Sequence, residues 1–536
     1  MRILVLKIFF LMGVLAVAAR LFYWQIYKSD NLKNLAENQR NEVRKVTAQR
    51  GQILASDGYP LATNVPAYNL LIDLAIVRKH VQDIEVLKKI SPNITTALED
   101  LRQKWVTIGP VEKFDLDFEG VTMEESSLRV YPEASISGQM TGFLGKDNEG
   151  QPKGYFGLEG FYDRFLSGRS GRLTQVEDAF NRPILVGDRK VVPAQDGSDV
   201  QTSIDRTVQF LVDNKLKKAI DKYGATSGSI LVMEPATGQI IAMTSFPNYD
   251  PNRYSQYPTE IYKNPAVAGT YEPGSTFKTL IMSAGLDVGV IDPETECDIC
   301  AGPVKIGEYS IKTWNEKYYP NTTMTDVIAH SDNTGMVFVQ KKLGGKKMLE
   351  YLTKFGIGSS TDIDLEEEIF LPLKKLGDWR EVDLATAAFG QGIAITPIQI
   401  LRAVGAIANK GIMLTPKIKM DTEVGKSVRV ISEKTATQIT TMMINSVEKG
   451  DAKWARPVGF DIAGKTGTAQ IAIGGHYDEK KTIASFIGFA PADRPKFVML
   501  VLLVEPKSSQ WGSETAAPLW FDIAKELFRY YRIAPK

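Results

Sequence analysis

Three short groups of residues combine the side chains that a catalytic serine needs. They are Ser275-Thr-Phe-Lys278, Ser331-Asp-Asn333 and Lys465-Thr-Gly467. A serine hydroxyl of ordinary acidity is a poor nucleophile, so it needs a base within hydrogen-bond reach. A lysine, with a reference pKa of ~10.4, acts as that base at neutral pH only if burial or a nearby cation lowers its pKa. Together, the three groups predict a serine acyl-transferase.

Each member of the set has an expected part in acyl transfer. Ser275 is the candidate nucleophile, Lys278 is its base, and Lys465 is the cation that lowers the pKa of Lys278. Ser331 is expected to pass protons between the lysines and the leaving amine. Asn333 is expected to hold Lys278 and a substrate amide.

A second serine-lysine pair fits the first pattern, because short motifs recur by chance. Ser446-Val-Glu-Lys449 repeats its spacing. Glu272-Pro-Gly274 predicts a turn that opens a helix over residues 276–286, so Ser275 is expected at a helix N-terminus with its lysine one turn away. Ser446 is instead expected near the end of a helix over 433–447, on the solvated surface. The context favours Ser275 as the nucleophile.

The other two groups also have look-alikes. Ser29-Asp30-Asn31 repeats the second group, but it precedes any domain in which a site could close. Gly459 to Thr466 satisfies the phosphate-loop pattern G-x-x-x-x-G-K-[ST], which makes a nucleotide-binding protein an alternative. A phosphate loop needs a strand before it and a helix after it, whereas residues 467–473 alternate as a strand does. That strand is expected edge-on to Ser275, where the N–H groups of Thr468 and Ser275 would meet the oxyanion.

Composition argues against several other classes of protein. The 536 residues are 43% hydrophobic and 24% charged, which is ordinary for a globular chain long enough for two or more cores. A net charge of +1 lacks the basic excess of a nucleic-acid-binding protein. Cys297 and Cys300 are too few for a four-thiolate zinc site, and their spacing is open to a local disulfide, a redox pair or two unrelated thiols. No metal or cofactor is predicted.

The N-terminus is predicted to reach a membrane. An apolar run from Ile3 to Tyr27, with Lys7 and Arg20 near its ends, is long enough to cross a bilayer. A cleaved signal peptide is the competing interpretation. Positive charge at the short N-terminus predicts that it stays in the cytoplasm and that the rest of the chain lies outside, in a periplasmic or extracellular space.

The patterns along the chain divide it into four regions. These are a membrane anchor (1–27), a helical or solvated stalk (28–45), an N-terminal mixed α/β pedestal domain (46–195) and an α/β domain with the catalytic groups (200–536). In the pedestal, the Asp57-Gly58 turn predicts a hairpin. The pedestal sequence shows no pattern that pairs a nucleophile with a base.

The last region predicts a sheet with helices against it. The expected elements are strands over 229–233, 239–244, 482–489 and 496–504, and an amphipathic helix over 513–531. The fold class is therefore α/β (α+β), with a central, mainly antiparallel sheet.

These groups resemble the signature motifs of class B penicillin-binding proteins, the peptidoglycan D,D-transpeptidases. The resemblance covers Tyr271-Glu-Pro-Gly-Ser-Thr-Phe-Lys278, Phe389-Gly-Gln-Gly392 with Thr396-Pro397, Lys465-Thr-Gly-Thr-Ala-Gln470, and in the pedestal Arg50-Gly51, Arg129-Val-Tyr131-Pro132 and Gly157-Leu-Glu159 through Gly168. It implies the penicillin-binding and serine β-lactamase fold, a dimerisation-type pedestal, and the division-specific type in preference to the elongation type.

The resemblance also implies a reaction. Ser275 would attack the penultimate D-Ala carbonyl of a stem peptide, release the terminal D-Ala and pass the acyl group to an amine on a neighbouring strand. Thr466, Gly467 and Thr468 would bind the substrate. Lys465, Thr466 and Thr468 would hold its carboxylate, which β-lactams imitate. No glycosyltransferase region lies between anchor and pedestal, so a polytopic partner enzyme would polymerise glycan, alongside division-machinery proteins.

Alternatives with the same motifs are a β-lactamase, a β-lactam sensor and a catalytically inactive scaffold. The pedestal argues against a lactamase, and the single anchor against a multi-span sensor. Two departures from the family pattern stand out. Ser56-Asp57-Gly58 replaces a more usual Asp-Arg-Asn-Gly turn, and Asp332 stands where many members have serine. The acceptor amine, and the choice between septum and side wall, are not determined by these motifs.

Overall fold

The computed structural model contains two compact units. It describes residues 1–536 except 34–40, 92–93, 113–117, 177–188, 421–425 and 475. The first unit comprises residues 1–51 and 164–198, and the second comprises 52–163 and 199–536. The domain boundaries proposed from sequence patterns stay predictions.

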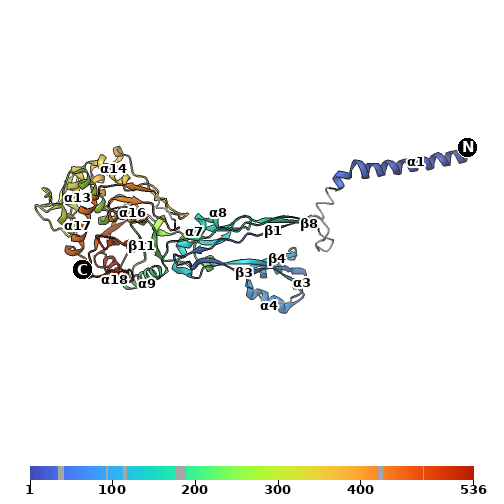
Figure 1. Ribbon diagram of the computed structural model, residues 1–536, viewed down its shortest axis with the longest axis horizontal. Helices are drawn as coiled ribbons and strands as arrows, with labels where there is room; N and C mark the ends of the chain where they lie inside the picture. The colour runs from blue at the N-terminus through green and yellow to red at the C-terminus, as the bar shows by residue number, and fades with distance from the viewer. Residues whose placement is uncertain (34–40, 92–93, 113–117, 177–188, 421–425, 475) are drawn as a thin grey trace. The chain divides into compact units, whose positions relative to one another are not determined.

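The first unit contains the apolar helix and a small sheet. Helix α1 (Arg2–Phe22) continues into η1 (Tyr23–Tyr27), and together they are long and apolar enough to cross a membrane. The sheet has the order β1-β8-β9, with β1 (Asn41–Val46), β8 (Gly171–Val176) and β9 (Arg189–Val192). Strands β1 and β8 run side by side (Figure 1). The helical interpretation of the predicted stalk is therefore wrong from Asn41 onward. The backbone there forms a strand that pairs with β8 instead of a helix.

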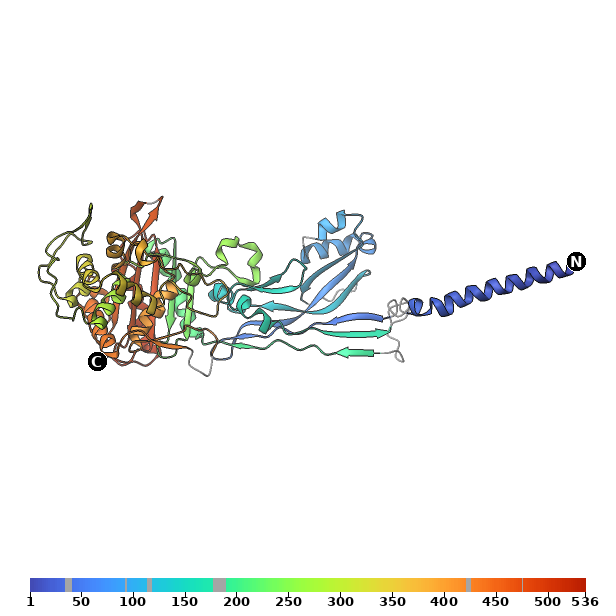
Figure 2. The ribbon, with the colours of Figure 1, turned by 90° about the horizontal axis from the view of Figure 1, so that it is seen from above.

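In the second unit, the N-terminal part forms a sheet of its own. Its strands are β2 (Ile53–Leu54), β3 (Pro60–Asp73), β4 (Trp105–Val111), β5 (Val121–Val130) and β10 (Val200–Gln201), and its helices are α3 (Leu74–Val77), α4 (Val81–Ile90) and α5 (Ile94–Glu99). Strands β2 and β3 pair across Asp57-Gly58, as the sequence predicted. The helices cover one face of the sheet (Figure 2) and bury Leu70, Leu87 and Ile108 against it.

A buried ion pair ties the family-like segments of this part together. Arg129, at the end of β5, donates from Nε to Glu159 Oε1 at 2.7 Å, and both side chains are almost fully buried. Glu159 belongs to α7 (Gly157–Phe161), which follows the hairpin of β6 (Phe143–Lys146) and β7 (Pro152–Tyr155). Tyr131 extends the network, because its N–H donates to Asn252 Oδ1 at 2.9 Å. These polar residues hold segments together, in agreement with the structural role expected for them.

The catalytic region is built on a five-stranded antiparallel sheet of order β12-β11-β19-β18-β17. Its strands are β11 (Ser227–Met233), β12 (Ile240–Phe246), β17 (Ala463–Ile473), β18 (His476–Ala490) and β19 (Phe497–Val504). The four strands expected from the sequence are confirmed within this sheet.

Helices cover both faces of that sheet. Helices α9 (Arg206–Tyr223) and α18 (Ala516–Tyr530) pack against one face of the sheet. Their apolar side chains and those of the sheet form one core, which includes Trp520 and Phe486. Helix α16 (Pro397–Ala408) lies on the other face, where Gly405 lets it approach Met233 and Val498. Burial of this apolar sheet from both sides fixes its strands in place.

Further helices carry or surround the site. They are α11 (Lys278–Val288), α12 (Met324–Ala329), α13 (Asn333–Leu343), α14 (Gly345–Lys354), α15 (Glu381–Ala387) and α17 (Glu433–Lys449). Short strand pairs join β13 (Val304–Ile306) to β14 (Tyr309–Ile311), and β15 (Ile412–Leu414) to β16 (Ser427–Arg429). Cys297 and Cys300 are buried and disulfide-bonded to each other, which selects the local disulfide from the three interpretations of their spacing.

Candidate active site

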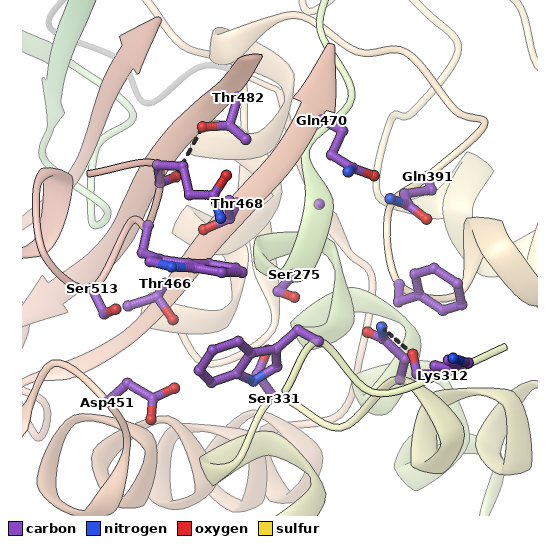
Figure 3. Close-up of a pocket in the computed structure, with 16 residues that line it drawn as sticks. Ser275, Lys312, Ser331, Gln391, Asp451, Thr466, Thr468, Gln470, Thr482 and Ser513 are labelled. Atoms are coloured by element: carbon purple, nitrogen blue, oxygen red, sulfur yellow. Dashed lines mark hydrogen bonds between the residues drawn. The ribbon is translucent and has the colours of Figure 1, made fainter. Parts of the chain in front are cut away.

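Ser275 lies in a tight turn that leads directly into a buried helix. The turn is η5 (Gly274–Phe277), and α11 begins at Lys278. Gly274 has φ +54°, and its N–H donates to Gly390 O at 3.0 Å. A side chain at Gly274 would lie 2.8 Å from Thr468 O, so glycine allows this turn to approach β17. Among the described residues, the Ser275 hydroxyl has no hydrogen-bond partner, and it faces a cleft (Figure 3).

Lys278 is fully buried beneath this cleft, with its amine held by three oxygens. Its Nζ donates to Ser331 O at 2.6 Å and to Asn333 Oδ1 at 2.7 Å, and Ser331 Oγ lies at 3.3 Å. Burial, reinforced by the positive charge of Lys465 and opposed by Asp332, holds the pKa of Lys278 well below its ordinary value.

This geometry suits a neutral amine. The two closest acceptors, a carbonyl oxygen and an amide oxygen, cannot donate, so they match the two N–H groups of a neutral amine. The third direction is left to the Ser331 hydroxyl, which can donate as well as accept. Lys278 can therefore take up a proton and return it.

The Ser331 group forms a strained turn between α12 and α13. Ser331 has φ +57°, a left-handed conformation that is unfavourable for a residue with a side chain, and in it the carbonyl oxygen meets Lys278. Asp332 caps α13 by accepting from Thr334 N at 2.7 Å. The aspartate at position 332, where many members of the family have serine, thus has a structural role as a helix cap. Asn333 is held in place because its Nδ2 donates to Lys312 O at 3.0 Å.

Lys465 lies on β17 and is also buried. Its Nζ donates to Thr466 O at 3.2 Å, and burial lowers its pKa to about 8, against the charge of Asp451, which raises it. Below pH 8 it stays cationic and depresses the pKa of Lys278. The phosphate-loop alternative is wrong, because residues 464–466 lie within a strand rather than a loop that opens a helix.

Gly467 sets the distance between β17 and the nucleophile. A side chain there would lie 2.3 Å from Ser485 Oγ and 2.9 Å from Thr276 Cγ2. Gly467 is not among the residues that line the cleft, whereas Thr466 and Thr468 on either side of it are. Gly512 N donates to Thr468 Oγ1 at 3.0 Å, which fixes that side chain. Gly467 therefore brings its neighbours close to Ser275, and its own part in substrate binding stays a prediction.

The cleft has a volume of about 320 Å³ and brings together segments far apart in the chain. Sequence reasoning assigned no role to several of its lining residues: Lys312, Trp314, Asp451, Thr482, Gln510, Trp511 and Ser513. The Trp314 and Trp511 rings lie 4.9 Å apart and form an apolar wall. Phe389 and Gln391 belong to a segment whose family likeness was noted, but nothing local to the other residues indicates a site.

Ser446, the second serine that fits the serine-lysine spacing, is separate from the cleft. Ser446 lies in α17 and is only 8% exposed, so the prediction of a solvated serine is wrong, although Lys449 is exposed. The helix packs this face inward against its neighbours, and neither residue lines the cleft. Ser29-Asp30-Asn31 follows η1 in the other unit.

Comparison with protein families agrees with this arrangement. The model of the penicillin binding protein transpeptidase domain matches residues 228–529, and that of the penicillin-binding protein dimerisation domain matches residues 102–202. The chain therefore belongs to the penicillin-binding protein transpeptidase family, and within it to class B. The fold and family anticipated from the motifs are confirmed.

Individual relatives extend over nearly the whole chain. Stage V sporulation protein D of Bacillus subtilis is 32% identical over 569 residues, covering 100% of this chain and 86% of that protein. Peptidoglycan D,D-transpeptidase FtsI of Escherichia coli is 27% identical over 553 residues, covering 98% of this chain and 91% of that protein.

Solved structures share the fold. Penicillin-binding protein 3 of Mycobacterium tuberculosis, in complex with aztreonam, has a TM-score of 0.73 at 24% identity and covers 92% of this chain and 98% of that chain. Penicillin-binding protein 2X of Streptococcus thermophilus has a TM-score of 0.74 at 23% identity, with 91% and 80% covered.

Proposed function

We propose that this chain is a serine D,D-transpeptidase that cross-links peptidoglycan stem peptides and is acylated by β-lactams. The buried Lys278 amine is the observation that carries the proposal. It lies one turn from Ser275, is bonded to Ser331 and Asn333, and has a lowered pKa. An inactive scaffold would have no need to keep a lysine buried and poised in this way.

In the acylation step, Lys278 takes the proton from Ser275 Oγ, which attacks the penultimate D-Ala carbonyl carbon. The N–H groups of Ser275 and Thr468 receive the developing oxyanion. The C–N bond then breaks, and the proton passes from Lys278 through Ser331 to the leaving D-Ala amine. Thr466 and Thr468 hold the substrate carboxylate, with the charge of Lys465 behind them.

In the transfer step, the amine of a second stem peptide attacks the Ser275 ester. A new C–N bond forms, the ester C–O bond breaks, and the amine proton returns to Ser275 Oγ through Ser331 and Lys278. A β-lactam takes the first step only, because its leaving amine stays attached to the acyl group and blocks the approach of the acceptor.

We place the enzyme on the outer side of a membrane, with α1 as an uncleaved anchor and its N-terminus in the cytoplasm. Apolar length and the charges of the N-terminal segment support this topology. A polytopic glycosyltransferase and division-machinery proteins are the expected partners. Likeness to FtsI supports a division role, and likeness to a sporulation protein over the full chain makes a spore-specific wall the second candidate.

Labelling with a fluorescent penicillin tests the function. The wild-type protein should take up label and keep it for minutes or longer, and Ser275→Ala should take up none. Ser446→Ala is the matched control and should label normally. Rapid loss of label would indicate a β-lactamase, no label at all a scaffold, and loss of label in Ser446→Ala alone would overturn the assignment of the nucleophile.

A further inference from the structure

One carboxylate lines the cleft and takes no direct part in the acylation proposed above, although its charge raises the pKa of Lys465. Asp451 lies just after α17, is exposed, and lines the cleft together with Thr466 and Ser513 (Figure 3). Within the described part of the chain it makes no hydrogen bond or ion pair, and no other acidic residue lines the cleft there. A carboxylate that no hydrogen bond or ion pair satisfies is available to a ligand.

Asp451 lies toward the end of the cleft where the leaving group is expected. This step rests on the proposed function, in which Thr466 and Thr468 hold the carboxylate of the terminal D-Ala. Figure 3 shows Asp451, Ser513 and Thr466 on one side of Ser275, and Gln391 and Gln470 on the other. The terminal D-Ala therefore departs on the Asp451 side.

The acceptor amine must enter on the same side. Both half-reactions pass through a tetrahedral centre at the same carbonyl carbon, so the incoming amine occupies the position that the leaving amine vacated. An approaching primary amine is protonated in neutral water and is attracted by a carboxylate. A carboxylate on the carbon that bears the amine is repelled by Asp451, and this repulsion opposes its binding to Thr466 and Thr468.

We propose that Asp451 selects the acyl acceptor, favouring an alkyl amine whose amine-bearing carbon has no free carboxylate over a zwitterionic amine. Lysine side chains, and diamino acids whose carboxylate beside the amine is amidated, belong to the favoured class. The interaction of one exposed charge across a few ångströms of partly screened cleft corresponds to about a fivefold change in the preference.

The test measures how an acyl-enzyme divides between two acceptors. The full-length protein in detergent is given a benzoyl-D-alanyl thioester as acyl donor, with D-alaninamide or D-alanine as acceptor, and the aminolysis products are quantified. Asp451→Asn should lower the ratio of D-alaninamide to D-alanine transfer about fivefold, and Asp451→Lys should lower it further. Glu448→Gln, which removes another exposed carboxylate outside the cleft, should leave the ratio unchanged. The difference between wild type and Asp451→Asn should shrink at 0.5 M salt.

Two results would overturn the proposal. One is an unchanged acceptor ratio in Asp451→Asn while thioester turnover stays normal. The other is an equal change for both acceptors with a displaced pH profile, which would mean that Asp451 acts through Lys465. The proposed function has a separate readout, because failure of the wild-type protein to take up fluorescent penicillin would refute that function itself.

Discussion

Two regions of the second unit hold buried charges that are compensated differently: the catalytic cleft, and the segments that link the N-terminal part to the catalytic region. In the cleft, Lys278 and Lys465 are surrounded by neutral oxygens, and burial lowers the pKa of both. In the linking region, the buried Glu159 is paired with Arg129, and the half-buried Glu367 accepts from Gly157 N at 2.9 Å.

The difference lies in how each charge is compensated. A lysine held only by neutral oxygens loses its proton readily, which is the property that a general base needs. A carboxylate that meets a guanidinium keeps its charge and holds two segments together. Buried charge thus supplies chemistry in one region and connection in the other, and the contrast can be tested residue by residue.

The largest effect is expected at Lys278. Lys278→Met keeps the volume of the side chain but removes the base, so the rate of acylation by penicillin should fall about 10⁴-fold. Removal of the desolvated amine offsets the loss of its hydrogen bonds to Ser331 and Asn333, so any loss of thermal stability should be smaller than that of a broken ion pair. Stopped-flow acylation and a thermal melt measure the two quantities, and a loss of stability comparable to that of a broken ion pair would contradict the contrast.

Arg129→Met should show the opposite pattern. It leaves Glu159 buried without its guanidinium partner, which costs about 3–5 kcal/mol of unfolding free energy. Once folded, the variant should be acylated by penicillin at nearly the wild-type rate, because Arg129 does not line the cleft. Chemical denaturation gives the stability. A stable but inactive variant would show that the linking region takes part in the chemistry.

Glu367 should make stability fall as pH rises. Its carboxyl is half-buried, burial raises its pKa to about 7, and its oxygens accept from Gly157 N and Asn264 N. Between pH 4.5 and 7 the folded state binds more protons than the unfolded state, so stability decreases across this window by about 2 kcal/mol. Glu367→Gln should flatten that slope in denaturation curves measured from pH 4.5 to 7.5. If stability depends on pH in the same way in Glu367→Gln as in the wild type, Glu367 is not the source of that dependence.

Lys465 should set the alkaline limit of acylation. It is needed as a cation and its pKa is about 8, so the acylation rate should fall by about fivefold from pH 8 to pH 9. Lys465→Arg keeps the charge at these pH values and should remove this decline, although at a lower maximum rate. A rate-against-pH profile of penicillin acylation measures both. An alkaline decline that persists in Lys465→Arg would assign it to another group.

Much of the site could be predicted from local patterns. The Pro-Gly turn before Ser275 predicted a helix, and the alternation after Gly467 predicted a strand, because turns, helices and strands have sequence periods of their own. Ser446 shows the limit of such patterns. Its place near the end of a helix was foreseen, but its burial was not, since burial depends on which face the neighbouring helices cover.

By itself, the sequence determined the three motifs, their order, and the elements that carry them, because backbone propensity and hydrophobic period act over a few residues. Only the tertiary structure decided which other side chains join them. Trp511 and Asp451 reach the cleft from loops distant from Ser275 in the sequence. The lowered pKa of Lys278 is likewise a tertiary property, because it comes from burial and from a cation on a strand nearly two hundred residues away.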